Sequence, residues 1–133
     1  MTTIAEVAGI DHRSATLLRK AGIKTAEAFL ERAREENHLR LLSEQTGISH
    51  QTLVDVATAA DLMRLQGLGS RYCALLGAAG IHTVEDLGKR SAEEVTEKLE
   101  AANHKTRMVK RLPTLHAVQS WVRQAASADD RDG

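Results

Sequence analysis

Residues 65–91 read LQGLGSRYCALLGAAGIHTVEDLGKRS, and they repeat residues 7–33, which read VAGIDHRSATLLRKAGIKTAEAFLERA. With an offset of 58 positions and no gap, the two segments are identical at 10 of 27 positions. The identical pairs are Gly9/Gly67, Arg13/Arg71, Leu17/Leu75, Leu18/Leu76, Ala21/Ala79, Gly22/Gly80, Ile23/Ile81, Thr25/Thr83, Glu27/Glu85 and Arg32/Arg90. A repeat of one short supersecondary unit predicts an architecture built from that unit. Each copy reads as glycine-containing turns between helices, so the sequence predicts an all-α fold.

Helix boundaries can be read from both copies. The pattern Ala-Gly-Ile-x-Thr at 21–25 and 79–83 supplies a glycine C-cap, an apolar anchor for the core and a threonine N-cap. Pairs of the Ser/Thr-x-x-Glu/Asp type also predict helix starts at Thr3, Thr83 and Ser91. The predicted helices are about 3–8, 12–20, 25–36, 38–46, 50–65, 70–79, 84–90, 92–102 and 115–127, with a short turn or helix at 105–111.

Composition limits the class of protein. Lys+Arg and Asp+Glu both number 18, so the net charge is zero, whereas a general nucleic-acid binder usually carries a basic excess. Aromatic residues make up only 2% of the chain, so the core must be mainly aliphatic. One cysteine excludes an internal disulfide and fits a reducing compartment. No apolar run approaches the ~20 residues of a membrane span, and no signal peptide is visible. We therefore expect a soluble, cytoplasmic protein with no membrane partner.

The second turn carries a pattern with a defined ligand chemistry. Gly67-Leu68-Gly69 precedes a predicted helix that has the small residue Cys73 four positions after the second glycine. This resembles the helix-hairpin-helix motif, which implies sequence-independent contact with the DNA backbone across the minor groove. Two glycines let the backbone turn tightly and approach a phosphate without a Cβ. Backbone amides at a helix N-terminus form a ready anion site.

The predicted phosphate-binding residues extend beyond this hairpin. Arg64 and Arg71 lie on either side of it in the sequence and would add charge-assisted contacts. The full set of predicted nucleic-acid or phosphate-binding residues is Arg64, Gly67, Leu68, Gly69, Ser70, Arg71, Lys105, Arg107, Lys110 and Arg111. Leu68 would be the buried anchor of the hairpin. The alternative is that the hairpin only turns two helices at a steep angle.

The first hairpin departs from the pattern. It reads Gly9-Ile10-Asp11, so a carboxylate replaces the second glycine. Aspartate tolerates unusual φ values, but its charge would repel a phosphate. We expect Asp11 to cap the following helix rather than to contact DNA.

The whole chain resembles an uncharacterised bacterial family of domains of unknown function built from tandem helix-hairpin-helix units. The resemblance covers about 1–128. It is carried by residues 59–64, 67–69, 75–76, 79–81, 83–84 and 87. At the C-terminal end it is carried by the signature Arg111-Leu112-Pro113-Thr114, with Val118, Trp121-Val122 and Gln124-Ala125. It implies two helix-hairpin-helix repeats, at about 7–33 and 65–91, in one compact helical domain over 1–128. A disordered acidic tail is expected at 129–133. The resemblance implies no activity, because fold does not imply function.

Zero net charge conceals a basic segment. Residues 101–128 hold five Lys/Arg and no carboxylate: Lys105, Arg107, Lys110, Arg111 and Arg123. A basic face of this kind is open to three interpretations, namely a solvated helix surface, a nucleic-acid contact or the docking site of an acidic protein.

Several single residues have other possible roles. Trp121 lies on the apolar stripe of the last helix and is expected in the core, with an exposed partner contact as the alternative. Tyr72 is expected to pack on a neighbouring helix or to flank a ligand. Cys73 is expected to be a small buried residue without a nucleophilic role. None of the six histidines has metal-ligand spacing, so no metal or other cofactor is predicted.

No catalytic constellation stands out. The adjacent carboxylates Glu35-Glu36 and Glu93-Glu94 would point about 100° apart on a helix and would not converge on a substrate. We therefore predict a non-enzymatic module. One hypothesis is binding of double-stranded DNA through the second hairpin. The other is a protein–protein interaction or scaffolding module in which the hairpins are purely architectural.

Overall fold

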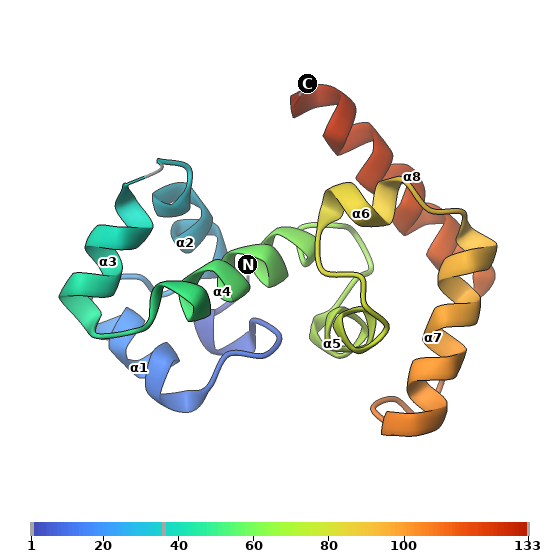
Figure 1. Cartoon of the computed structure of the whole chain (residues 1–133), viewed down its shortest axis with the longest axis horizontal. Coiled ribbons are helices and arrows are strands. Elements are labelled where there is room, and N and C mark those ends of the chain that lie inside the picture. Colours follow the sequence, from blue (N-terminus) through green and yellow to red (C-terminus); the bar gives the residue numbers. More distant parts are fainter. Residues whose placement is uncertain (1, 36, 133) are drawn as a thin grey trace. The chain divides into compact units, whose positions relative to one another are not determined.

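In the computed structural model, residues 2–35 and 37–132 are described, and within them the secondary structure is helical with no strand (Figure 1). The elements are the 3-10 helix η1 (Ile4–Glu6) and the α-helices α1 (His12–Lys20), α2 (Ala26–Ala33), α3 (His38–Thr46), α4 (His50–Leu62), α5 (Ser70–Ala78), α6 (Val84–Gly88), α7 (Ala92–Thr106) and α8 (Leu115–Asp132). The predicted all-α class is confirmed. No helix in this part of the chain has the length and apolar character needed to cross a bilayer.

Helix boundaries agree best where a cap was recognised. Asp11, Thr25, Thr83 and Ser91 each accept a hydrogen bond from the amide three residues later, and the helices begin directly after them. Thr3 makes no such bond, and the predicted helix at 3–8 is only the 3-10 turn η1. The starts of these four helices therefore coincide with their side-chain caps, whereas α3 was predicted at its observed bounds without such a cap.

The region 102–132 differs most from its prediction. Helix α7 continues to Thr106, and it ends at Arg107, which adopts the left-handed conformation with φ 54°. The sequence predicts a short turn or helix at 105–111; residues 105 and 106 instead belong to α7, and 107–111 form a non-helical connection with a bend at 110–111. Helix α8 ends at Asp132, so it includes all of the predicted acidic tail except Gly133, which lies outside the described residues, as does Glu36 of the predicted carboxylate pair.

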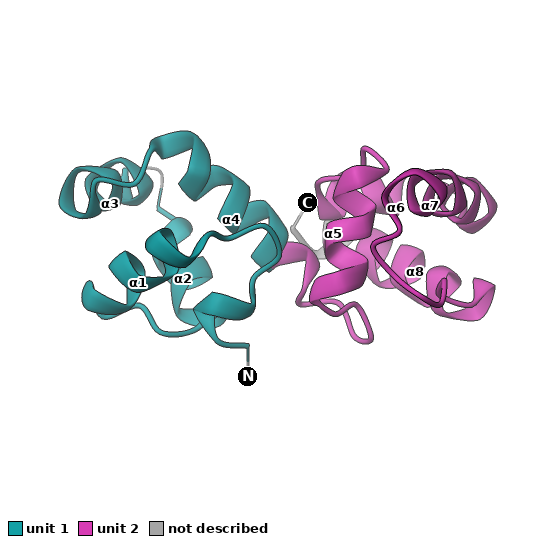
Figure 2. Ribbon diagram, turned by 90° about the horizontal axis from the view of Figure 1, so that it is seen from below, with its two compact units in different colours: residues 1–60 teal, residues 61–133 magenta. Residues whose placement is uncertain are grey.

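The chain divides into two compact units, residues 1–60 and 61–133 (Figure 2). The core of the first unit is aliphatic apart from Phe29, and it brings η1, α1, α2, α3 and α4 together. Ile4, Leu18, Phe29 and Leu53 are fully buried there. The predicted single domain over 1–128 remains a prediction.

The second unit is organised around α8. This helix contacts α6 and α7, and α5 also contacts α7. Trp121 of α8 is 1% exposed, which confirms the predicted core position, and Val118 and Ala125 are buried on the same stripe. Leu115, the first residue of the helix, is 44% exposed.

The two copies of the repeat share the backbone hydrogen bonds of their turns and helix ends. In the first copy the amides of residues 7, 10, 15, 21, 22, 23 and 29 donate to the carbonyls of residues 4, 7, 11, 17, 19, 18 and 25. In the second copy the amides of residues 65, 68, 73, 79, 80, 81 and 87 donate to the carbonyls of residues 62, 65, 69, 75, 77, 76 and 83, which is the same pattern shifted by 58. Equivalent positions can therefore be compared atom by atom, one copy in each unit.

Candidate functional site

The turn at 67–69 is fixed by its backbone and by one buried side chain. The amide of Leu65 donates to Leu62 O at 3.1 Å, and that of Leu68 donates to Leu65 O at 3.2 Å. Gly67 has φ +83°, a conformation that glycine adopts without the steric cost of a Cβ. Leu68 is 3% exposed, so the predicted anchor of the hairpin is buried. The glycines on both sides of it stay exposed at the surface.

Helix α5 begins at this surface without a side-chain cap. Gly69 is the N-cap residue, and it has no side chain to accept a hydrogen bond. Its carbonyl accepts from the amide of Cys73 at 2.9 Å. The amides of Ser70, Arg71 and Tyr72 donate to no described residue. Unpaired first-turn amides carry the positive end of the helix dipole, so this terminus attracts an anion.

An open groove of about 540 Å³ lies against the turn and the start of α5. We call it the hairpin groove, and its lining residues are Gly67, Gly69, Ser70, Arg71, Tyr72, Val109, Lys110 and Arg111. Three of these are cations and none is a carboxylate. Arg71, Lys110 and Arg111 make no ion pair with any side chain that the structure describes. The groove therefore combines free backbone amides with uncompensated positive charge.

Residues 109–111, which belong to the basic segment 101–128, are held against the hairpin by two sets of contacts. The side chain of Asn103 donates to Val109 O at 3.1 Å and accepts from Val109 N at 3.0 Å. The hydroxyl of Tyr72 donates to Arg111 O at 3.1 Å. The Tyr72 ring also contacts Trp121, with ring centroids 5.5 Å apart. Sequence reasoning missed Asn103, whose only signal was an amide side chain in the last turn of a helix.

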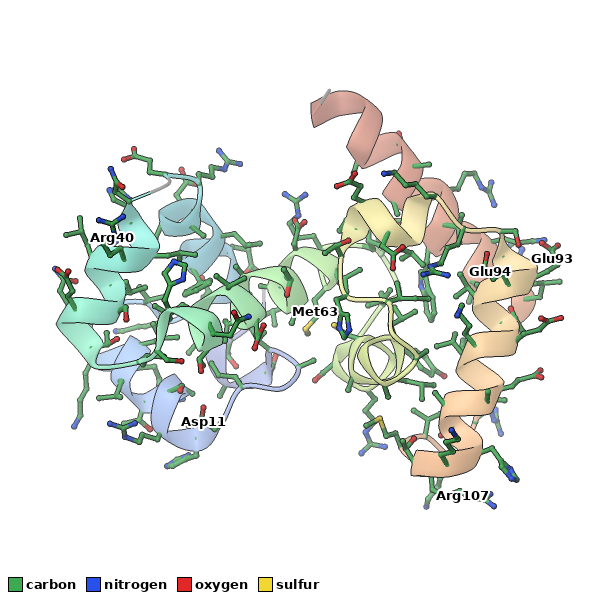
Figure 3. The ribbon with its side chains drawn as sticks, viewed as in Figure 1. Asp11, Arg40, Met63, Glu93, Glu94 and Arg107 are labelled. Atoms are coloured by element: carbon green, nitrogen blue, oxygen red, sulfur yellow. The ribbon has the colours of Figure 1, made fainter. Side chains whose placement is uncertain are left out.

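The first copy shows what occupies the same position when the N-cap is not glycine. Asp11 Oδ2 accepts from Ser14 N at 3.0 Å, and Oδ1 accepts from Ser14 Oγ at 2.6 Å. These bonds lower the pKa of Asp11. The prediction that Asp11 caps its helix is confirmed (Figure 3). A carboxylate thus fills, in the first copy, the space that is open beside Gly69 in the second.

The charge around the two turns also differs in sign. Residues 4–13 contain Glu6, Asp11 and Arg13, which sum to a charge of −1. The equivalent residues 62–71 contain Arg64 and Arg71, which sum to +2. Glu6 corresponds to Arg64, and Asp11 corresponds to Gly69. The second turn combines positive charge with a free amide at Tyr72, whereas the equivalent amide of Ser14 is bound by Asp11 in the first copy.

The structure brings together most, but not all, of the predicted site residues. Those lining the hairpin groove are Gly67, Gly69, Ser70, Arg71, Lys110 and Arg111. Arg64 instead lines a different groove and forms an ion pair with Asp61, with Nε to Oδ1 at 3.0 Å. Lys105 and Arg107 are exposed at the end of α7 and line neither groove. Arg107 is labelled in Figure 3.

Other candidate residues have structural explanations. Burial raises the pKa of the Cys73 thiol to about 11, which keeps it protonated and inert near neutral pH. Ser91 Oγ accepts from the amide of Glu94, and the Glu94 carboxylate pairs with Arg90. No group of three or more His, Cys, Asp or Glu side chains among the described residues is arranged to hold a metal ion.

Comparison with known proteins shows which family the chain belongs to, but it indicates no activity. Residues 8–128 match the family described as a domain of unknown function (DUF4332). No curated protein and no solved structure matched the chain. The geometry of the grooves is therefore the basis for a functional assignment.

Proposed function

We propose that this chain, which belongs to the family described as a domain of unknown function (DUF4332), is a non-enzymatic helix-hairpin-helix module that binds the DNA backbone through its second hairpin. The observation that carries the proposal is the uncapped N-terminus of α5, which faces a groove with three cations and no carboxylate. The proposed ligand is a backbone phosphate of double-stranded DNA.

A phosphate in the hairpin groove would meet two kinds of donor. The amides at the start of α5 offer hydrogen bonds aligned with the helix dipole. Arg71, Lys110 and Arg111 add charge, and arginine matches the geometry of phosphate oxygens with two parallel N–H groups. Contacts of this kind position a protein on the duplex but read no bases. Binding would therefore be independent of sequence.

The first hairpin supports this assignment by contrast. Its backbone hydrogen bonds match those of the second, so the fold alone does not make the difference. The Asp11 carboxylate already occupies the amide of Ser14 and would repel a phosphate. We propose that the first copy, including Gly9 and Ile10, is architectural and makes no phosphate contact.

Fluorescence anisotropy of a labelled DNA duplex tests the proposal, with Gly69→Asp as the decisive variant. A Cβ at Gly69 has no heavy atom within 4 Å, and Gly69 has φ −82° against −83° for Asp11. The aspartate should therefore cap α5 as Asp11 caps α1 and put a carboxylate in the groove. We expect micromolar binding by the parent at about 50 mM salt, a steep loss at about 200 mM, and no binding by Gly69→Asp.

Gly69→Ala is the matched control, because it adds a Cβ to the same open space but no charge and no acceptor. It should keep most of the affinity. Circular dichroism should show unchanged helicity in both variants. Equal binding by the parent and Gly69→Asp would move the contact away from this hairpin, and no binding by the parent would reject DNA as the partner.

The second hypothesis, a protein-interaction or scaffolding module, has one observation in its favour. Met108 lies within the basic segment 101–128 and is 44% exposed, and Leu115 is exposed to the same extent. Exposed apolar side chains next to cations suit an acidic, partly apolar protein surface. Failure of DNA binding together with loss of a captured partner on Met108→Ser would favour this second function.

A further inference from the structure

The second unit has another open groove, of about 720 Å³, where the end of the hairpin meets α8. We call it the α8 groove, and it is lined by Arg64, Leu65, Ser120, Arg123, Gln124, Ser127 and Ala128. Two lining residues are arginines, and none is a carboxylate. Arg123 is exposed and pairs with no described carboxylate, whereas Arg64 is paired with Asp61. Arg123 is thus the arginine of this groove that is available to an external anion.

Residues 65–67, which we call the ridge, connect the lining of the α8 groove with that of the hairpin groove. Arg64 and Leu65 line one side, and Gly67 lines the other. Leu65 and Gly67 are two residues apart, so their Cα atoms are at most about 7 Å apart.

Gln124 fixes this ridge to α8. Its Oε1 accepts from Gln66 N at 2.8 Å, and its Nε2 donates to Gln66 O at 3.2 Å. The same Nε2 donates to Ser120 Oγ at 3.1 Å. The backbone N–H and C=O of Gln66 are therefore both hydrogen-bonded to the side chain of Gln124, which is adjacent to Arg123 in the sequence. The two grooves keep a fixed spacing because a single helix anchors the hairpin between them.

From this arrangement we infer that the α8 groove binds a phosphate of the second DNA strand, with Arg123 as its main contact. The hairpin groove takes a phosphate of one strand, the ridge at 65–67 faces the minor groove, and the α8 groove takes a phosphate of the opposite strand. The inference rests on the proposed function and extends it, because it predicts a preference for duplex DNA over a single strand that one phosphate site would not impose.

The test compares a labelled duplex with a labelled single strand of the same length, using the full chain. Arg123→Ala should weaken duplex binding about tenfold at low salt, as expected for one charged hydrogen bond. It should also reduce the slope of log K against log salt by about 1. Binding of the single strand should not change. Arg123→Lys should restore the salt slope, since it keeps the charge.

Arg40→Ala is the matched control, because Arg40 is an exposed arginine on α3 of the first unit and lines neither groove (Figure 3). It should bind both DNAs as the parent does. Unchanged duplex binding by Arg123→Ala, or an equal loss for duplex and single strand, would overturn the proposed contact with the second strand. Neither result would contradict the phosphate site at the hairpin. If the parent binds neither DNA, the proposed function itself fails, and this inference fails with it.

Discussion

At the scale of single residues, Arg107 is the clearest departure from ordinary backbone preference. It is the only non-glycine residue with positive φ among those described, and it ends α7 where glycine is the usual choice. The left-handed conformation costs a residue with a Cβ roughly 1–2 kcal/mol. No described residue forms an ion pair or a side-chain hydrogen bond with Arg107 that would offset this cost.

We therefore predict that Arg107→Gly stabilises the protein. Part of the gain is lost to the greater freedom of glycine in the unfolded chain, so the net effect should be about 0.5–1 kcal/mol. The melting temperature should rise by about 2–4 °C in a chain of this size. Arg107→Ala removes the same guanidinium but keeps the strain, so it should melt close to the parent. Equal melting of the glycine and alanine variants would contradict the argument.

At the scale of the helices, Gly88 decides how closely α6 approaches α8. A Cβ at Gly88 would stand 2.9 Å from Ala126 N and 3.0 Å from the carbonyl carbon of Ala125. These are backbone atoms, so they cannot move aside unless the helices separate. We predict that Gly88→Ala destabilises the protein by about 1–3 kcal/mol in urea unfolding.

Gly77 of α5 provides the opposite case for the same substitution. The nearest heavy atom to its added Cβ is His82 Nδ1 at 3.9 Å. Gly77→Ala should therefore stabilise the protein by about 0.5–1 kcal/mol through helix propensity. Destabilisation by both alanines, or by neither, would show that the closeness of α6 and α8 is not what Gly88 provides.

The cap of α1 makes a contribution to stability that depends on pH. Hydrogen bonds from Ser14 hold the pKa of Asp11 below its usual 3.8 in the folded protein. A carboxyl group with a depressed folded pKa stabilises the fold above its unfolded pKa and loses that effect as pH falls through the folded value. The difference in unfolding free energy between the parent and Asp11→Ala should therefore be largest near pH 7 and smallest near pH 2. A difference that does not vary with pH would assign the effect to packing alone.

At the scale of the whole molecule, the distribution of charge matters more than its sum. The net charge is zero, yet the two grooves of the second unit gather Arg64, Arg71, Lys110, Arg111 and Arg123 without a lining carboxylate. Release of counterions depends on the phosphates neutralised locally. The proposed binding mode neutralises one phosphate in each groove, and two phosphates predict a slope of log K against log salt of about −1.8.

Anisotropy titrations at a series of NaCl concentrations measure this slope. A parallel series in sucrose separates the effect of ions from that of water activity and should be nearly flat. A slope close to zero would mean that the neutral molecule has no concentrated basic site for DNA.

The sequence predicted helices best where the signal was local. Side chains that cap their own helix, such as Asp11 and Thr25, need only a few residues of context. The contact of Tyr72 with Arg111 joins residues 39 apart, and that of Gln124 with Gln66 joins residues 58 apart. Such pairs depend on how helices pack. The sequence alone therefore could not predict which residues line the hairpin groove, or that Arg64 and Arg71 line different grooves. The choice between turn and helix at 105–111 stays open in the sequence for the same reason, because Asn103 holds Val109 in a non-helical loop.

The cap at Asp11 also has a consequence for stoichiometry. A carboxylate attached to the chain beside its own helix N-terminus is present at a high effective concentration, which an anion free in solution does not match. The first copy therefore behaves as a site that is permanently filled by part of the molecule itself. Although the chain carries the same unit twice, its hairpins should together take up one phosphate rather than two.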